Sequence, residues 1–216
     1  MRIYVNQLKQ HLNQLAPVYL VLGDEPLQKI QTVDAIRHAC TQQGFDERIS
    51  LIQGPQFGWH DLNANGQNLS LFSNKQLIEL ELTSLKPGQE GAKVINEFLA
   101  HQSPDTILLI HGPKATAEAQ KAKWFKALES KGIFVQLTQP EGHHFVKWLE
   151  GEIAKHRLNI EPQGISLLSQ MFEGNLLAAS QELEKLSLQV GQHALDVAGL
   201  KQRVTNQSRF SLFELQ

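Results

Sequence analysis

The chain has 216 residues, and its 20 lysines and arginines against 22 aspartates and glutamates give a formal net charge of −2. Basic and acidic residues number 13 and 13 in residues 1–140, and 7 and 9 in residues 141–216. This balance argues against a basic protein that grips nucleic acid by itself. The single cysteine, Cys40, excludes a disulfide framework and a multi-cysteine zinc site. Because no stretch approaches the roughly 18 apolar residues of a membrane span and the amino terminus lacks a signal-peptide core, we expect a cytoplasmic protein without membrane contact.

Five short apolar runs in residues 1–140 predict β-strands. Most are apolar on both faces, which is typical of a sheet covered by helices on both sides. The runs are Val18–Leu22, Arg48–Ile52, Gln76–Leu82, Thr106–Ile110 and Ile133–Leu137. Only the third run alternates at its end, where Glu79 and Glu81 share one side, and this predicts a solvated face there.

Helical periodicity lies between several of these runs. Apolar residues recur at three- and four-residue steps over residues 27–40, 94–99 and 117–128. Asp24 is the expected cap of the first helix, and Gly44 its stop. Strands that alternate with helices predict an α/β fold with a doubly wound parallel sheet.

The pattern changes after Pro140, where β-type runs disappear. Apolar stripes at helical spacing lie over residues 145–153, 165–172, 176–186 and 197–204. We therefore expect an α/β domain at residues 1–140 and a small all-α helical domain at residues 141–209.

The segment after the first predicted strand partly matches the phosphate-binding P-loop, G-x-x-x-x-G-K-[ST]. Gly23 and Lys29 have the right spacing, but Gln28 replaces the second glycine and Ile30 lacks the hydroxyl that would bind magnesium. Asp24 and Glu25 would place negative charge where phosphates sit. The sequence predicts a nucleotide-binding scaffold without its chemistry, with no cofactor and no metal. An active nucleotide-dependent enzyme with an atypical site stays open as an alternative.

Other candidate residues have simpler explanations. His111 ends a predicted strand, where α/β enzymes place catalytic groups, but no nucleophile or carboxylate pair accompanies it. Cys40 falls in the apolar stripe of a helix, which predicts a buried, inert thiol. Trp124 and Phe125 lie among lysines, and core packing is the favoured interpretation of both rings.

Between the second and third predicted strands, polar turn residues of the run Asn65 to Asn74 flank a compact Leu-Ser-Leu-Phe. One interpretation is a loop that tucks two apolar side chains into the local core. The other is a hydrophobic anchor presented to a partner. Burying a leucine and a phenylalanine stabilises by roughly 1.5–3 kcal/mol each, and such anchors are typical interface hot spots.

The anchor resembles a known recognition sequence. It is similar to the pentapeptide Gln-Leu-Ser/Asp-Leu-Phe, by which bacterial proteins bind the sliding clamp of DNA replication. Leu69, Ser70, Leu71 and Phe72 match directly. The glutamine is displaced, because Asn68 holds its place and Gln67 precedes it.

The surroundings extend the resemblance. The blocks VYLVLGDEPLQ, SLFSNKQLIEL, ILLIHGPKATAEAQKAKWFKAL and FEGNLLAASQELEKLSL, taken in order, resemble the delta subunit of the bacterial DNA polymerase III clamp loader. The resemblance implies the AAA+-like, P-loop fold of clamp-loader ATPases in a degenerate form without a working nucleotide site. Those ATPases carry a sensor arginine in a G-x-x-R motif, and here Gly174 is followed by leucine at that place.

The resemblance further implies a non-catalytic accessory subunit of a DNA-directed DNA polymerase (nucleotidyltransferase) holoenzyme. Such a subunit binds the sliding clamp (beta subunit) and opens the ring for loading onto primed DNA, which it meets indirectly within the complex. Leu71 and Phe72 would form the wedge, while Leu69 and Ser70 would shape the loop. The other partners would be the ATPase and delta-prime subunits of the loader, which consume the ATP.

The last residues repeat part of the anchor. Phe210-Ser211-Leu212-Phe213 contains Ser-Leu-Phe, but Ser211 and Glu214 form a capping box, which indicates the start of a helix. By resemblance, residues 210–216 begin a collar domain. A third hypothesis, a regulatory module that reads DNA through its helical domain, is opposed by the near-neutral charge.

Overall fold

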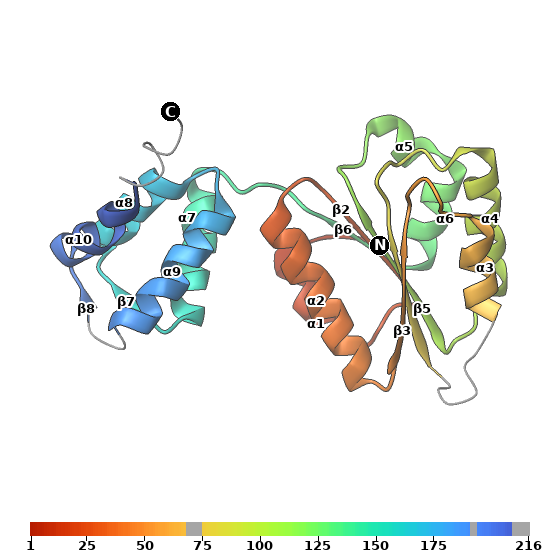
Figure 1. Cartoon of the computed structure of the whole chain (residues 1–216), viewed down its shortest axis with the longest axis horizontal. Coiled ribbons are helices and arrows are strands. Elements are labelled where there is room, and N and C mark those ends of the chain that lie inside the picture. Colours follow the sequence, from red (N-terminus) through yellow and green to blue (C-terminus); the bar gives the residue numbers. More distant parts are fainter. Residues whose placement is uncertain (68–74, 191–193, 209–216) are drawn as a thin grey trace. The chain divides into compact units, whose positions relative to one another are not determined.

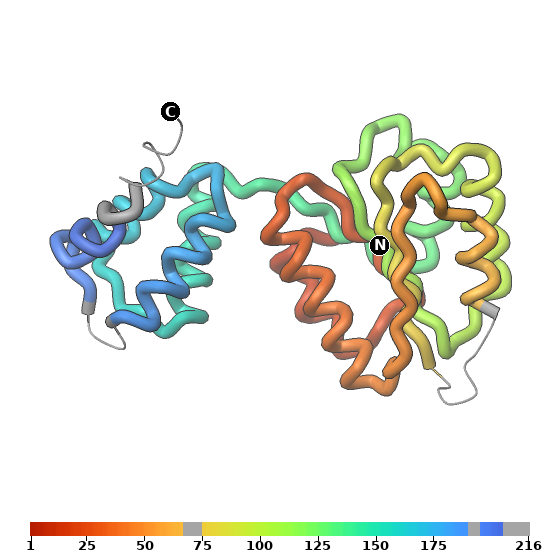
Figure 2. The backbone as a smooth tube through the Cα atoms, in the orientation of Figure 1, coloured from red at the N-terminus to blue at the C-terminus, as the bar shows by residue number. Residues whose placement is uncertain are grey.

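The computed structural model describes residues 1–67, 75–190 and 194–208, and the chain divides into two compact units, Met1–Thr138 and Gln139–Gln216. Figure 1 shows the helices and strands, and Figure 2 shows the course of the backbone. The first unit contains the large sheet, and the second is mainly helical. No helix in the described ranges is long and apolar enough to cross a bilayer.

The first unit is built on six parallel strands, in the order β1-β6-β2-β5-β4-β3 across the sheet. They are β1 (Arg2–Tyr4), β2 (Val18–Leu22), β3 (Glu47–Ile52), β4 (Gln76–Glu81), β5 (Thr106–Gly112) and β6 (Ile133–Gln136). All five strands predicted from sequence are confirmed. The edge strand β1 was not predicted, because only Ile3 of its three residues is buried and so short a strand has no visible period.

Helices cover both faces of this sheet (Figure 1). On one face η1 (Val5–Gln7), α1 (Leu8–His11) and α2 (Pro26–Gln42) cover a core that includes Tyr19, Val21 and Ile36. On the other face α3 (His60–Gln67), α4 (Gly88–His101), α5 (Ala117–Lys121) and α6 (Lys123–Lys131) cover a core that includes Leu20 and Phe125. The doubly wound α/β fold is therefore confirmed.

The single helix expected over residues 117–128 is two helices. Ala122 between α5 and α6 has an extended conformation, with φ −65° and ψ 146°. The break lets Ala119 and Trp124 both reach the core. Since neither glycine nor proline stands at this position, nothing in the sequence marks the break.

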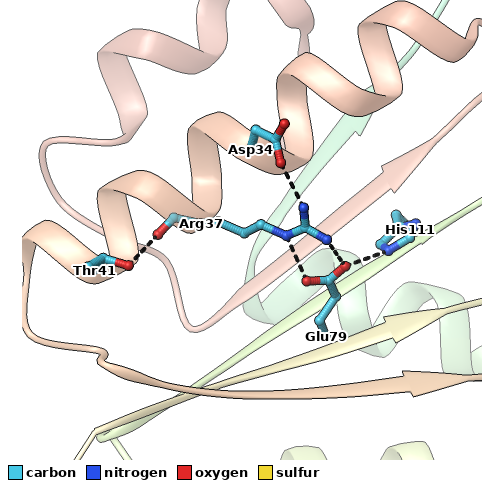
Figure 3. Close-up of polar contacts among 5 residues, drawn as sticks. All are labelled: Asp34, Arg37, Thr41, Glu79 and His111. Atoms are coloured by element: carbon cyan, nitrogen blue, oxygen red, sulfur yellow. Dashed lines mark hydrogen bonds and ion pairs between the residues drawn. The ribbon is translucent and has the colours of Figure 1, made fainter.

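The expectation of a solvated face at Glu79 is wrong. Only 4% of Glu79 is exposed, because β4 lies inside the sheet and α2 covers it. Arg37 of α2 donates from Nε to Oε2 of Glu79 at 2.8 Å, and from Nη2 to Oε1 (Figure 3). His111 Nε2 of β5 lies 3.0 Å from the same Oε1. Asp34 accepts a further bond from Arg37 Nη1 at 2.7 Å.

This network sets the ionisation of Glu79. Burial alone would raise the pKa of the Glu79 carboxyl. The hydrogen bonds from His111 and Arg37, together with their charges, outweigh burial and lower its pKa from 4.5 to about 2. A carboxyl whose pKa is lower in the folded chain stabilises that fold above its unfolded pKa, and loses the contribution as the pH falls.

The second unit contains α7 (His143–Lys155), α8 (Pro162–Phe172), α9 (Leu176–Val190) and α10 (Val197–Ser208). All four predicted helices are confirmed. A short parallel pair, β7 (Asn159–Ile160) and β8 (Ala194–Leu195), was not predicted. Two-residue strands show no alternation, so the sequence carried no signal for them.

Arg157 closes α7 in an unfavourable conformation. Its φ of +55° is the left-handed region, and the described residues include no other non-glycine residue with a positive φ. The N–H of Arg157 donates to Ala154 O, and that of Leu158 to Ile153 O, as in a helix end that favours glycine. An L-residue there costs about 1 kcal/mol.

We expect Glu79→Gln to lower the free energy of unfolding by about 2 kcal/mol at pH 7, because Arg37 and His111 lose their anionic partner. The difference from the parent chain should shrink as the pH falls from about 4.5 towards 2, where Glu79 itself becomes protonated. Chemical denaturation at several pH values measures both effects. Glu81→Gln, on the same strand, is the control and should cost below about 0.5 kcal/mol; a pH-independent difference for Glu79→Gln would contradict this explanation.

Arg157→Gly should raise the free energy of unfolding by about 0.5–1 kcal/mol, because glycine relieves the left-handed strain. Arg157→Ala keeps a Cβ atom and should bring no such gain. Thermal unfolding of the three chains makes the comparison, and equal stability of the glycine and alanine variants would rule out backbone strain as the cause.

Candidate functional site

The proposed clamp-binding residues, 67–72, begin at the end of α3. Gln67 is the last residue of that helix. The other five, Asn68, Leu69, Ser70, Leu71 and Phe72, lie outside the described residues, which resume at Lys75. The structure therefore describes the two ends of this segment and the elements that hold them.

The near end, where α3 leads into segment 68–74, packs against α4. The expectation that Asn65, Gly66 and Gln67 form a turn is wrong, because α3 continues through all three. Gly66 faces the Phe98 ring so closely that a Cβ atom there would lie 2.4 Å from Phe98 Cε2. Since no L side chain fits at that distance, Gly66 permits the close approach of α3 to α4.

The far end, where segment 68–74 leads into β4, is held by backbone and side-chain hydrogen bonds of Gln76. Gln76, the first residue of β4, is 1% exposed, and its N–H donates to Asp105 O at 2.8 Å. Its side-chain Nε2 donates to the carbonyl oxygen of Asn65 in α3 at 3.0 Å, and to Thr106 Oγ1 of β5 at 3.2 Å. The two ends of segment 68–74 are thus joined to each other and to the sheet.

Lys75 adds a contact on the α2 side of the far end. Its Nζ donates to the carbonyl oxygen of Gln43 at 3.3 Å and lies 5.2 Å from the centre of the Phe45 ring. Both partners follow α2, so the residue before β4 is connected to a second element.

A small cavity adjoins the near end. It has a volume of about 200 Å³ between α3 and α4, and its lining consists of Asn63, Gly66, Glu97, Phe98, His101 and Gln102. Ligand pockets for drug-sized molecules span about 300–1,000 Å³. This cavity is too small to enclose a nucleotide.

The degenerate phosphate loop lies between β2 and α2, as expected. The cap of α2 is Glu25 and not Asp24: Glu25 is buried, and its Oε2 accepts the N–H of Gln28 at 2.5 Å. Asp24 Oδ1 instead accepts the N–H of Lys114 at 3.0 Å. The α2 N-terminus, where a phosphate binds in a working P-loop, holds the chain's own carboxylate.

The residue in place of the second glycine has a structural contact. Gln28 is buried, and its Oε1 accepts the N–H of Thr138 at 3.2 Å. Gly23 lies against Leu137, whose carbonyl oxygen would be 2.5 Å from a Cβ atom there. Lys29 is partly exposed, and Ile30 is 55% exposed. The loop is therefore packed against the end of β6 by Gly23 and Gln28.

The other candidates are accounted for by packing. Trp124 and Phe125 are buried in the core, and burial raises the pKa of the Cys40 thiol to about 12. No cluster of three or more histidine, cysteine, aspartate or glutamate side chains suited to a metal occurs among the described residues. His111 does have a carboxylate partner, Glu79, which sequence reasoning missed. The position of Glu79 between the apolar residues Ile78 and Leu80 was the available signal.

Comparison with known proteins gives consistent matches. The family model described as DNA polymerase III, delta subunit, matches residues 19–138, which is more than half of the chain. The DNA polymerase III subunit delta of Escherichia coli K12 is 29% identical, and the match covers 98% of this chain and 62% of the relative. The corresponding Haemophilus influenzae protein is 30% identical, over 99% and 63%. The chain thus spans a little over three fifths of the length of these relatives.

Solved structures share the fold. The Bacillus subtilis DNA clamp loader delta protein superposes with a TM-score of 0.67 at 17% identity, over 91% of this chain and 60% of that one. The Thermotoga maritima RuvB Holliday junction branch migration motor gives 0.57 at 10% identity, over 93% and 67%. At these identities the likeness concerns the fold alone, and that fold agrees with the AAA+-like architecture that the family resemblance implied. On the extent of the family match, the chain belongs to the DNA polymerase III delta subunit family.

Proposed function

We propose that this chain binds the sliding clamp through residues 67–72 and holds the ring open, as a non-catalytic subunit of the clamp loader. The observation that carries the proposal is the anchored frame around this segment. The end of α3 and the start of β4 are joined by the Gln76 side chain, and Gly66 packs against Phe98. Such a frame suits a segment that presents side chains outward to a partner.

Leu71 and Phe72 are the proposed anchors. Two apolar side chains that enter a pocket on the clamp contribute about 2 kcal/mol or more each when they act as hot spots. Leu69 and Ser70 shape the connection. Gln67 and Asn68 supply the polar contact that the glutamine of the recognition pentapeptide makes.

Ring opening requires selective binding. A ligand shifts the equilibrium between closed and open rings only by the difference in its affinity for the two states. The chain therefore needs contacts with the clamp that improve when one subunit interface of the ring opens. No covalent step is involved, and the ATP that drives the cycle is consumed by partner subunits.

The arrangement at the phosphate loop supports a subunit without its own nucleotide chemistry. A phosphate at the α2 N-terminus would compete with the Glu25 carboxylate for the N–H of Gln28. The Gln28 side chain already binds the N–H of Thr138. Ile30 offers no hydroxyl for magnesium.

The proposed partners are the beta clamp, the ATPase and delta-prime subunits of the loader, and primed DNA within the assembled complex. The place of action is the cytoplasm, with the replication machinery. The near-neutral charge of the chain fits an indirect contact with DNA.

The double variant Leu71→Ala with Phe72→Ala should bind the purified sliding clamp at least about tenfold more weakly, because both apolar anchors are lost. Surface plasmon resonance or calorimetry gives the affinity, and circular dichroism verifies folding. Leu212→Ala with Phe213→Ala is the matched control, since it removes the same residue types from the second Ser-Leu-Phe and should leave the affinity unchanged. Unaltered binding by a folded Leu71/Phe72 variant would contradict the assignment of these two residues as the clamp-binding anchors.

We expect no saturable binding of ATP with magnesium up to about 1 mM, which corresponds to a binding free energy of about −4 kcal/mol. Isothermal titration calorimetry measures this directly. Magnesium-dependent binding below 1 mM that is lost in Lys29→Ala would instead favour the nucleotide-dependent enzyme.

A further inference from the structure

We propose that Gln76 is the positioning residue of the clamp-binding segment. Its side-chain amide joins the last turn of α3 to the first residues of β4 and β5, and so holds the two ends of segment 68–74 in a fixed relation. This inference rests on the proposed function of that segment.

The contacts of the amide define the role. Nε2 donates to the Asn65 carbonyl oxygen at 3.0 Å and to Thr106 Oγ1 at 3.2 Å. The carbonyls of a helix's last turn lack partners within the helix, so the Asn65 oxygen is available as an acceptor. Gln76 Oε1 has no hydrogen-bond partner in the described part of the chain. The Gln76 side chain therefore acts through the two hydrogen bonds that its Nε2 atom donates.

Stability alone does not explain a glutamine at this place. Gln76 is 1% exposed, and it precedes the buried Leu77. A buried polar atom without a partner carries a desolvation cost, and a leucine of similar volume would avoid it. What leucine cannot supply is a directional bond from β4 to the end of α3.

The hydrogen bond from Gln76 to Asn65 restricts the rotation of the end of α3, which apolar packing leaves free. Against α4, the end of α3 is held by the contact of Gly66 with Phe98, which sets a distance but has no preferred direction of rotation, and by one exposed hydrogen bond from Asn63 Nδ2 to Glu97 Oε2 at 3.4 Å. The bond from Gln76 to Asn65 connects residues 11 positions apart, across the segment itself. A segment with both ends fixed loses less conformational freedom when it binds, which strengthens binding without any new contact to the partner.

The test compares Gln76→Leu with Thr106→Val in the intact chain, each titrated with the purified sliding clamp. Gln76→Leu breaks the link to α3 and should weaken binding about fivefold to tenfold. Thr106→Val removes the other acceptor of the same amide and leaves the Asn65 link in place. It should bind within about twofold of the parent chain, although both variants lose folding stability. Both are measured at a temperature where unfolding curves show them fully folded.

A synthetic peptide of residues 65–76 separates positioning from direct contact. The peptide has neither α4 nor β5, so Gln76→Leu should leave its clamp affinity unchanged. An equal loss in peptide and chain would mean that Gln76 touches the clamp, and would overturn the positioning role.

Two further outcomes would also overturn it: full clamp affinity of Gln76→Leu, or the same loss in Gln76→Leu and Thr106→Val. Either can occur while Leu71→Ala with Phe72→Ala still weakens binding at least about tenfold, which would leave the proposed function standing. Unchanged binding by that double variant would remove both proposals together.

Discussion

Parallel pairing of β4 with β3 on one side and β5 on the other decides where each candidate site can lie. In a parallel sheet, a crossover returns the chain from the carboxyl end of one strand to the amino end of the next. The connection through α3 therefore reaches β4 at its amino end, at Gln76. The degenerate phosphate loop begins at Gly23, directly after the carboxyl end of β2. The phosphate loop and the elements that frame the proposed clamp-binding segment therefore belong to opposite ends of the parallel strands.

The position of α2 depends on charges within the chain. In a nucleotide-binding P-loop, the negative phosphate compensates the positive helix N-terminus, and the magnesium ion bound beside it is held by the Ser/Thr hydroxyl. Here the Glu25 carboxylate caps that N-terminus, and Arg37 in the middle of the helix binds Glu79 of β4, on the face of the sheet that α2 covers. These contacts link α2 to its surroundings through the protein's own side chains. A scaffold that is connected in this way retains the AAA+-like architecture when its loop departs from the phosphate-binding pattern.

Helices and strands with a strong hydrophobic period could be predicted from the sequence, whereas elements that depend on contacts with distant residues could not. The five apolar strands and the stripe of α2 were evident, because burial on both faces or on one helical face leaves a period in the sequence. By contrast, α3 has little apolar content beyond Leu62, as its sequence HDLNANGQ shows. Its packing depends on the contact of Gly66 with Phe98, which lies more than thirty residues further along the chain. Glu79 looked solvated because its partners Arg37 and His111 come from two other elements. The proposed clamp-binding residues were assigned through the family resemblance, whereas the hydrogen bond from Gln76 to Asn65 follows only from the fold.

The contacts that hold the two ends of segment 68–74 are important for the proposed ring opening, because opening requires different affinities for the closed and the open ring. A segment on a loose connection could follow its pocket on the clamp whether the ring is closed or open, and would bind both states equally. Equal affinity shifts no equilibrium, however tight the binding. Under the proposed function, a segment whose ends are held by the contacts of Gly66 and Gln76 would fit one arrangement of the clamp better than the other, and only that difference in affinity would favour the open ring. For a subunit proposed to act as a wedge, the rigidity of the support is therefore as necessary as the apolar side chains of Leu71 and Phe72.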